Sequence, residues 1–173
     1  MPRLITSLLE SHLHFFDWNL ERIGRCLEEL TEEQIWQRPN VSSNSVGNQV
    51  LHLCGNIRQW IITGLGGAPD TRTRDEEFAA SGGPGKAELL RQLTDVIEQS
   101  KAVISGLSEA ELLRERPVQA FVHDGTFILT HVTEHLSYHT GQIIFWVKAL
   151  KDKDLDLYAG VDLTLKGEER PEQ

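Results

Sequence analysis

Four long segments of this 173-residue chain repeat apolar side chains every three or four positions, which is the spacing of an amphipathic α-helix. These segments span residues 4–30, 46–65, 86–106 and 127–150. No alternation of strands with helices, and no hairpin signal, competes with this pattern. The sequence therefore predicts an all-α fold, and the simplest arrangement is a four-helix bundle made of two helix pairs.

Two short helices are predicted within the helix pairs, and they share one layout. Thr31 and Ser108 each begin a capping-box pattern, with Gln or Glu three residues later. Pro39 and Pro117 follow, and a proline ends a helix at or before the preceding residue. The two halves of the chain therefore look alike, each with a long helix, a short helix and a second long helix.

One long crossover connects the second and third long helices. Residues 66–85 are rich in glycine, proline and charged side chains and form the longest connection in the chain. We expect residues 1–150 to form a single bundle domain. Residues 151–173 are a C-terminal extension, for which a short strand, an extended edge and a subunit contact all remain open.

The composition excludes several classes of protein. The chain is 39% apolar with a net charge of -9, and no apolar run approaches the roughly 20 residues of a membrane helix. No basic stripe is present, which argues against a nucleic-acid partner. No signal-peptide cleavage site is recognisable, which favours a cytoplasmic protein. Cys26 and Cys54 do not form a CxxC pair, so we expect two reduced, buried thiols.

Three histidines recur at intervals of four in the last long helix. His131, His135 and His139 therefore share one helix face. Two imidazoles at i and i+4 can bind one metal ion, but the outer pair lies about 12 Å apart along the helix axis and cannot. One adjacent pair therefore needs a third ligand from another element, and His52 is the strongest candidate. His123 falls in a predicted loop, where we expect it to be solvated.

The helix face around His52 is unusual for a solvated surface. Asn48, Gln49, His52, Asn56 and Gln59 share this face, and none of these side chains carries Lys-like or Glu-like charge. Uncharged polar groups suit a cleft, because they can orient a ligand at a low desolvation cost. A histidine pair at i and i+4 also occurs without a metal, so a packed set of imidazoles remains the alternative.

Three segments carry a resemblance to a known family. They are NSVGNQVLHLCGNIRQWI at residues 44–61, HVTEHLSYHTGQI at residues 131–143, and RTRDEEF at residues 72–78. The chain resembles the DinB-like superfamily of metal-dependent four-helix-bundle proteins, also called the DinB/YfiT type, and the resemblance covers most of its length. The third segment is similar to a branch that keeps Arg-Asp and Glu-Phe pairs in the crossover.

The resemblance implies a metal site and its ligands. In that superfamily one histidine of the second helix and two of the fourth hold a divalent ion, often zinc or nickel, with manganese as another option. By resemblance the ligands are His52, His135 and His139.

The general base, by contrast, is not visible in the sequence, so the catalytic residues stay unassigned. His131, Asn48 and Gln142 are candidates for side chains that surround the ligands. Arg58, Arg72 and Arg74 could meet a substrate carboxylate, although an arginine is more often solvated or paired.

The expected chemistry follows from the ligand set. Three neutral imidazoles leave a divalent ion its full charge and an open fourth position, as in catalytic sites. Such an ion lowers the pKa of water or of a thiol. Relatives include transferases that use bacillithiol or mycothiol, so the resemblance implies transfer of a low-molecular-weight thiol to a small electrophile. A metal-dependent hydrolase of unknown substrate and a non-catalytic, metal-binding or structural bundle are the alternatives.

The expected partners are few. We expect a small-molecule substrate, no nucleic acid and no membrane. Bundles of this kind often pair through a helix face, and the first helix carries an apolar excess at Phe15, Phe16 and Trp18. The sequence therefore predicts a homodimer.

Overall fold

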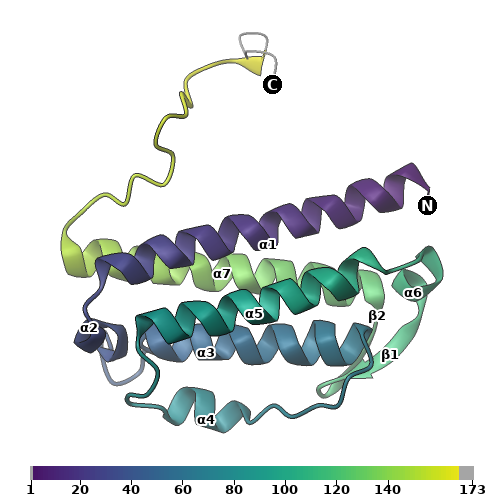
Figure 1. Cartoon of the computed structure of the whole chain (residues 1–173), viewed down its shortest axis with the longest axis horizontal. Helices are drawn as coiled ribbons and strands as arrows, with labels where there is room; N and C mark the ends of the chain where they lie inside the picture. Colours follow the sequence, from purple (N-terminus) through teal and green to yellow (C-terminus); the bar gives the residue numbers. More distant parts are fainter. Residues whose placement is uncertain (1, 168–173) are drawn as a thin grey trace.

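The computed structural model describes residues 2–167, and it confirms the predicted all-α bundle (Figure 1). Long helical segments occupy all four predicted regions. They are α1 (Arg3–Glu29), α3 (Val46–Ile57) with its continuation η1 (Arg58–Leu65), α5 (Lys86–Ser105) and α7 (Gly125–Lys151). The helix α1 packs along α7 and α5, and α3 packs against α5 and α7.

The apolar stripes of these helices meet in one core. Phe16, Ile23, Leu53, Ile97 and Leu136 are each completely removed from solvent. Burying a side chain of this size stabilises the fold by roughly 1.5–3 kcal/mol relative to leaving it exposed. Because Phe16 belongs to this core, its predicted place in a dimer surface is wrong, whereas Phe15 beside it is 40% exposed.

The last two turns of the second long helix are wider than an α-helix. The segment η1 is a π-helix, and the Gly66 N–H donates to Ile61 O at 2.9 Å, five residues earlier. A Cβ on Gly66 would lie 2.6 Å from Ile62 O, so glycine permits this ending. This segment carries Trp60 toward the candidate site.

The first predicted capping box is present. The Thr31 hydroxyl accepts from the Gln34 N–H, and the Gln34 side chain accepts from the Thr31 N–H, which begins α2 (Glu32–Trp36). At α6 (Glu109–Leu113) Ser108 accepts the Glu111 N–H. The capping box that begins α2 is therefore confirmed, whereas at α6 only the Ser108 half is present, because the Glu111 carboxylate pairs with Arg114 and Arg116 instead.

The expectation that no hairpin is present was wrong. After α6 the chain forms β1 (Glu115–Val118) and β2 (Phe121–Asp124), which pair antiparallel with Pro117 opposite Val122. A two-stranded hairpin leaves each strand with an outer edge, where a proline is tolerated. The connecting Gln119 has φ 54°, and this connection lacks the Asn-Gly or Asp-Gly signal that usually reveals such a turn.

The crossover contains a short helix that the sequence did not reveal. The helix α4 (Arg74–Ala79) lies against α3 within the predicted long connection (Figure 1). Six residues are too few for a helical period to be recognised. This helix is central to the site, because it carries Glu77.

The C-terminal extension begins attached to the bundle. Arg25 Nη2 donates to the carbonyl oxygens of Leu155 and Asp156, both at 2.9 Å, and Leu155 is buried. Beyond this point the chain leaves α7 as an irregular segment (Figure 1). Residues 168–173 of the predicted extension lie outside the described residues.

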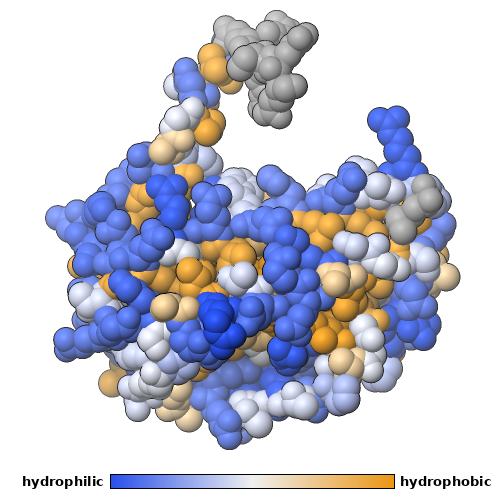
Figure 2. All heavy atoms as spheres, in the orientation of Figure 1, coloured by the Kyte–Doolittle hydropathy of each residue, from blue (hydrophilic) through white to orange (hydrophobic). Residues whose placement is uncertain are grey.

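The surface of the bundle is mixed. Figure 2 shows hydrophobic side chains gathered in a band across the middle of the viewed face, with hydrophilic side chains around them. None of the helices in residues 2–167 is both long and apolar enough to span a membrane. Cys26 is buried and Cys54 is partly buried, both are free thiols, and burial raises the pKa of each to about 12.

Candidate metal centre

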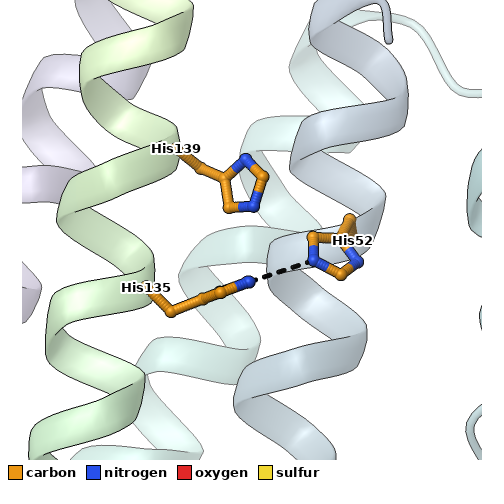
Figure 3. Close-up of side chains that lie close together, drawn as sticks. All are labelled: His52, His135 and His139. Carbon is orange, nitrogen blue, oxygen red and sulfur yellow. Dashed lines mark hydrogen bonds between the residues drawn. The ribbon is translucent and has the colours of Figure 1, made fainter. Parts of the chain in front are cut away.

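Three histidines from two helices point toward one another in the space between α3 and α7 (Figure 3). One ring nitrogen each of His52, His135 and His139 lies within 4.8 Å of the others. His52 Nε2 and His135 Nε2 are 3.1 Å apart. Nitrogens on one tetrahedral zinc ion lie roughly 3.4 Å apart, so small side-chain rotations would place all three on one ion.

The helix spacing explains which histidines converge. His135 and His139 are one turn apart on α7 and face the same neighbour, α3, which supplies His52. His131, one turn earlier, does not join the cluster. Its ring lies 4.2 Å from that of Trp60, between ring centroids, and burial lowers its pKa.

A carboxylate on the crossover holds His52. Glu77 Oε2 lies 3.0 Å from His52 Nδ1, and both residues are buried. The carboxylate accepts a hydrogen bond, so the proton of the neutral imidazole is assigned to Nδ1 and the lone pair to Nε2, the atom that faces His135. Metal-binding histidines commonly have such a carboxylate behind them, because it fixes the ring orientation and the tautomer.

An arginine neutralises this carboxylate. Arg72 donates from Nε to Glu77 Oε1 at 2.7 Å and from Nη2 to Glu77 Oε2 at 2.8 Å, and only 2% of its side chain is exposed. Burial raises the pKa of Glu77, but hydrogen bonds from Arg72 and His52 outweigh it and lower the pKa overall. Gln59 continues the network by accepting from Arg72 Nη1 at 2.9 Å and donating to Asp70 at 2.8 Å.

The helix α4 is fixed to α3 by two contacts. Asn48 Nδ2 donates to the carbonyl oxygens of Glu77 and Ala80, at 2.9 and 2.7 Å. A Cβ at Gly55 would overlap the Glu77 carboxylate and lie 2.9 Å from Arg72 Nε. Asn48, a predicted neighbour of the ligands, therefore acts through the backbone that carries Glu77.

Two glutamines adjoin His139. Gln49 Oε1 lies 3.4 Å from His139 Nδ1, and the side chain of Gln142, three residues after His139, raises the pKa of His139. The role of Gln142 as a side chain that surrounds the ligands stays a prediction. If Nδ1 donates to Gln49, the other ring nitrogen of His139 keeps its lone pair for a metal.

The imidazoles of α7 are uncharged at neutral pH. Burial, together with the neighbouring histidines, lowers the pKa of His135 to about 3 and of His139 to about 4. His135 Nδ1 is buried and has no hydrogen-bond partner among residues 2–167. A metal needs neutral imidazoles, so the donor set fits a divalent ion such as zinc or nickel.

A cavity of about 320 Å³ adjoins the cluster on the side of the β-hairpin. His123 lines it from β2, and its ring stacks on Phe127 with centroids 3.7 Å apart. The prediction of a loop position was therefore wrong, because His123 belongs to a hairpin strand that brings its half-buried ring onto the end of α7. We call this space the ring-lined cavity, and its lining residues are His52, Asn56, Trp60, Arg72, Arg74, Gln119, Phe121, His123, Phe127, His131 and His135.

Sequence reasoning missed Glu77, although it singled out the segment that contains it. The RTRDEEF segment was noted as a resemblance, and Arg72 was weighed as a paired arginine, which is how the structure places it. No rule of local spacing links Glu77 to His52, which precedes it by 25 residues. Only the packing of α4 on α3 brings them together.

Comparison with known proteins places this chain in a family. A family described as "Protein of unknown function (DUF1572)" matches residues 5–159. The chain belongs to this family. No curated protein matches the sequence.

Solved structures share the fold of this DUF1572 chain. A DinB-like protein from Bacillus subtilis has a TM-score of 0.65 at 18% identity, over 86% of this chain and 97% of its own. A DinB-like protein from Bacillus cereus has a TM-score of 0.66 at 17% identity, over 88% and 97%. A conserved protein from Enterococcus faecalis reaches 0.73 at 16% identity, over 83% and 97%. The DinB-like fold that the resemblance implied is confirmed.

Proposed function

We propose that this protein is a metal-dependent enzyme that holds one divalent ion, zinc or nickel, with His52, His135 and His139. The observation that carries the proposal is the convergence of these three ring nitrogens within 4.8 Å, beside a cavity. Three protein ligands leave a fourth position for a reactant, which distinguishes a catalytic site from a closed structural one.

The chain's own residues prepare the site. Glu77 fixes the orientation of the His52 ring. The charge of Arg72 balances that of Glu77, so the pair places no net charge beside the histidine. Gln49 and Gln142 orient His139. A divalent ion bound here would supply the positive charge that lowers the pKa of a thiol or of water.

We infer that the reaction is the transfer of a low-molecular-weight thiol, of the bacillithiol or mycothiol type, to a small electrophile. The open ligand position, the adjoining cavity and the resemblance to DinB-like transferases support this reaction. A carbon–sulfur bond forms, the bond from that carbon to its leaving group breaks, and the thiol proton departs with the leaving group. The expected setting is the cytoplasm, with a small-molecule substrate and neither nucleic acid nor membrane as partner.

The metal site is tested by mass spectrometry of metal content in untagged, EDTA-washed protein reloaded with zinc or nickel. We expect close to one ion per chain in the wild type and loss of the ion in His52→Ala and His135→Ala. The matched control is His12→Ala, because His12 lies away from the cluster, where its Nδ1 is hydrogen-bonded to Thr133 Oγ1 at 2.8 Å. A wild type that takes up neither ion would contradict the proposal.

The reaction is tested on the metal-loaded protein with electrophiles and a panel of thiols, following the product by mass spectrometry. Thioether formation that requires both the ion and the thiol is the expected result. If a substrate is hydrolysed in the absence of thiol, the proposed transferase activity is wrong and the protein is a hydrolase, while the proposed metal site still stands.

A further inference from the structure

The ring-lined cavity has a wall built from three elements. Trp60 comes from η1, Phe121 and His123 from β2, and Phe127 and His131 from α7. Adjacent rings are in contact along this wall. Centroid distances are 3.7 Å for His123–Phe127, 5.8 Å for Phe121–His123, 6.3 Å for Phe127–His131 and 4.2 Å for Trp60–His131.

This wall is open to a ligand. Phe121 is 54% exposed and Phe127 is 47% exposed, which is high for aromatic side chains beside a site. Aromatic faces bind flat, unsaturated bodies by stacking, which contributes about 0.5–1.5 kcal/mol per ring pair beyond the burial of area. The shape of the wall therefore favours a flat ligand over a bulky saturated one.

The charge of the cavity is opposite to that of the molecule. The chain carries a net charge of -9, yet no carboxylate is among the residues that line this cavity, whereas two arginines are. Arg72 is neutralised by Glu77 behind the wall. Arg74 is exposed. Its guanidinium carbon lies 4.7 Å from the centroid of the Phe78 ring, in a cation–π contact.

The position of Arg74 relates it to the histidines. The Phe78 ring beneath its guanidinium lies 4.8 Å from the ring of His52, between centroids. Asp75 and Glu76 follow Arg74 on α4 and share a second surface hollow with it, but neither carboxylate lines the ring-lined cavity. Asn56 also lines the cavity, is 4% exposed, and its Oδ1 has no hydrogen-bond partner in the described part of the chain. This oxygen is an acceptor, so a donor on the body of a ligand would satisfy it and a carboxylate would not.

We propose that the ring-lined cavity binds a small carboxylate with a flat, unsaturated body, which lies on the rings while its carboxylate pairs with Arg74. A guanidinium matches a carboxylate with two parallel hydrogen bonds. The inference rests on the proposed function in one respect, because it identifies this carboxylate as the electrophilic substrate. The binding itself needs no metal.

A second cavity, on the other side of the cluster, does not fit this ligand. It has a volume of about 490 Å³ and lies beside Gln49 and Gln142, and none of the described residues that line it is charged. An anion would lose its hydration there without gaining a charged partner. The carboxylate is therefore assigned to the ring-lined cavity.

Calorimetric titration with three unreactive probes tests the assignment. Benzoate is flat and anionic, benzamide is flat and neutral, and cyclohexanecarboxylate is anionic and saturated. Each is titrated into EDTA-washed protein and into metal-loaded protein. We expect benzoate to bind most tightly in both preparations, by about tenfold over each of the other probes.

Two variants locate the probe. Arg74→Gln is expected to weaken benzoate about tenfold and to leave benzamide unchanged, whereas Phe127→Leu weakens both. The control is Arg91→Gln, because Arg91 is an exposed arginine on α5, where it pairs with Glu88 and Asp95. All variants are checked for unchanged melting temperature, and Arg74 is exposed, so Arg74→Gln is expected to fold.

The outcomes separate this inference from the proposed function. Benzoate binding without metal uptake would support the cavity and contradict the enzyme. Metal uptake without selective benzoate binding would support the metal site and overturn the inference. Benzoate binding that appears only with metal and survives Arg74→Gln would also overturn it, because the carboxylate would then bind the ion itself.

Discussion

At the scale of single residues, Glu77 decides what His52 can do. Its carboxylate accepts from His52 Nδ1 at 3.0 Å, which leaves Nε2 as the donor atom for a metal. Arg72 holds the carboxylate from behind with two hydrogen bonds. A buried carboxylate here is stable because it is paired on both sides, with a guanidinium and an imidazole.

The first prediction concerns this carboxylate. Glu77→Gln removes its charge and keeps its size, and it leaves one acceptor oxygen in place of the two that now serve Arg72 and His52, so the tautomer of His52 is no longer fixed. We expect zinc affinity to fall about 10- to 100-fold in a competition titration with a chromogenic chelator. The free energy of unfolding falls by up to about 3 kcal/mol, because Arg72 loses its buried partner.

The control for this variant is on the same helix. Glu76→Gln changes an exposed carboxylate that accepts from Thr73 Oγ1. Zinc affinity should stay at the wild-type value. If Glu76→Gln and Glu77→Gln lower zinc affinity equally, the overall charge of α4 controls zinc binding and the contact between Glu77 and His52 does not.

At the scale of elements, the site depends on how closely α4 approaches α3. Gly55 faces the Glu77 carboxylate and Arg72, and a Cβ at this position would occupy the space of both side chains. Asn48, two turns earlier on α3, holds the backbone of α4 through two hydrogen bonds. The glycine and the amide together let a six-residue helix place a carboxylate behind a histidine.

The second prediction therefore concerns Gly55. Gly55→Ala pushes Glu77 and Arg72 away from α3, and we expect a loss of about 1–3 kcal/mol in the free energy of unfolding and weaker zinc binding. Gly141→Ala on α7 is the matched control, because a Cβ there would have no neighbour within 4 Å among residues 2–167. That variant should be more stable by about 0.5–1 kcal/mol in the same urea titration, since alanine favours a helix.

At the scale of the whole molecule, the bundle leaves part of α1 uncovered. Phe15 is 40% exposed and its ring stacks on Trp18 with centroids 6.0 Å apart, while Phe16 is in the core. An exposed apolar surface of this kind often marks a contact between chains.

The third prediction is a homodimer through α1. Light scattering with size exclusion should give a mass near twice 19.6 kDa, and Phe15→Glu should give a monomer. Val41→Glu is the control, because Val41 is 98% exposed in a loop away from α1. A wild-type mass near 19.6 kDa would contradict the prediction.

The sequence by itself determined the helices, because helical periodicity and caps are local. The four apolar stripes, the Thr31 capping box and the histidine pair at i and i+4 depend on residues a few positions apart. The same spacing showed that His131, His135 and His139 could not all bind one ion. It left open which adjacent pair does, and the resemblance chose His135 and His139.

Only the tertiary structure decided what surrounds those histidines. The hairpin that carries His123 has a turn without a recognisable signal, and α4 is too short to show a period. The pairing of Glu77 with His52 and of Arg72 with Gln59 joins residues whose separation in the chain follows no local rule. These contacts arise because buried charged and polar groups must find partners once the helices pack, and packing is a property of the whole chain.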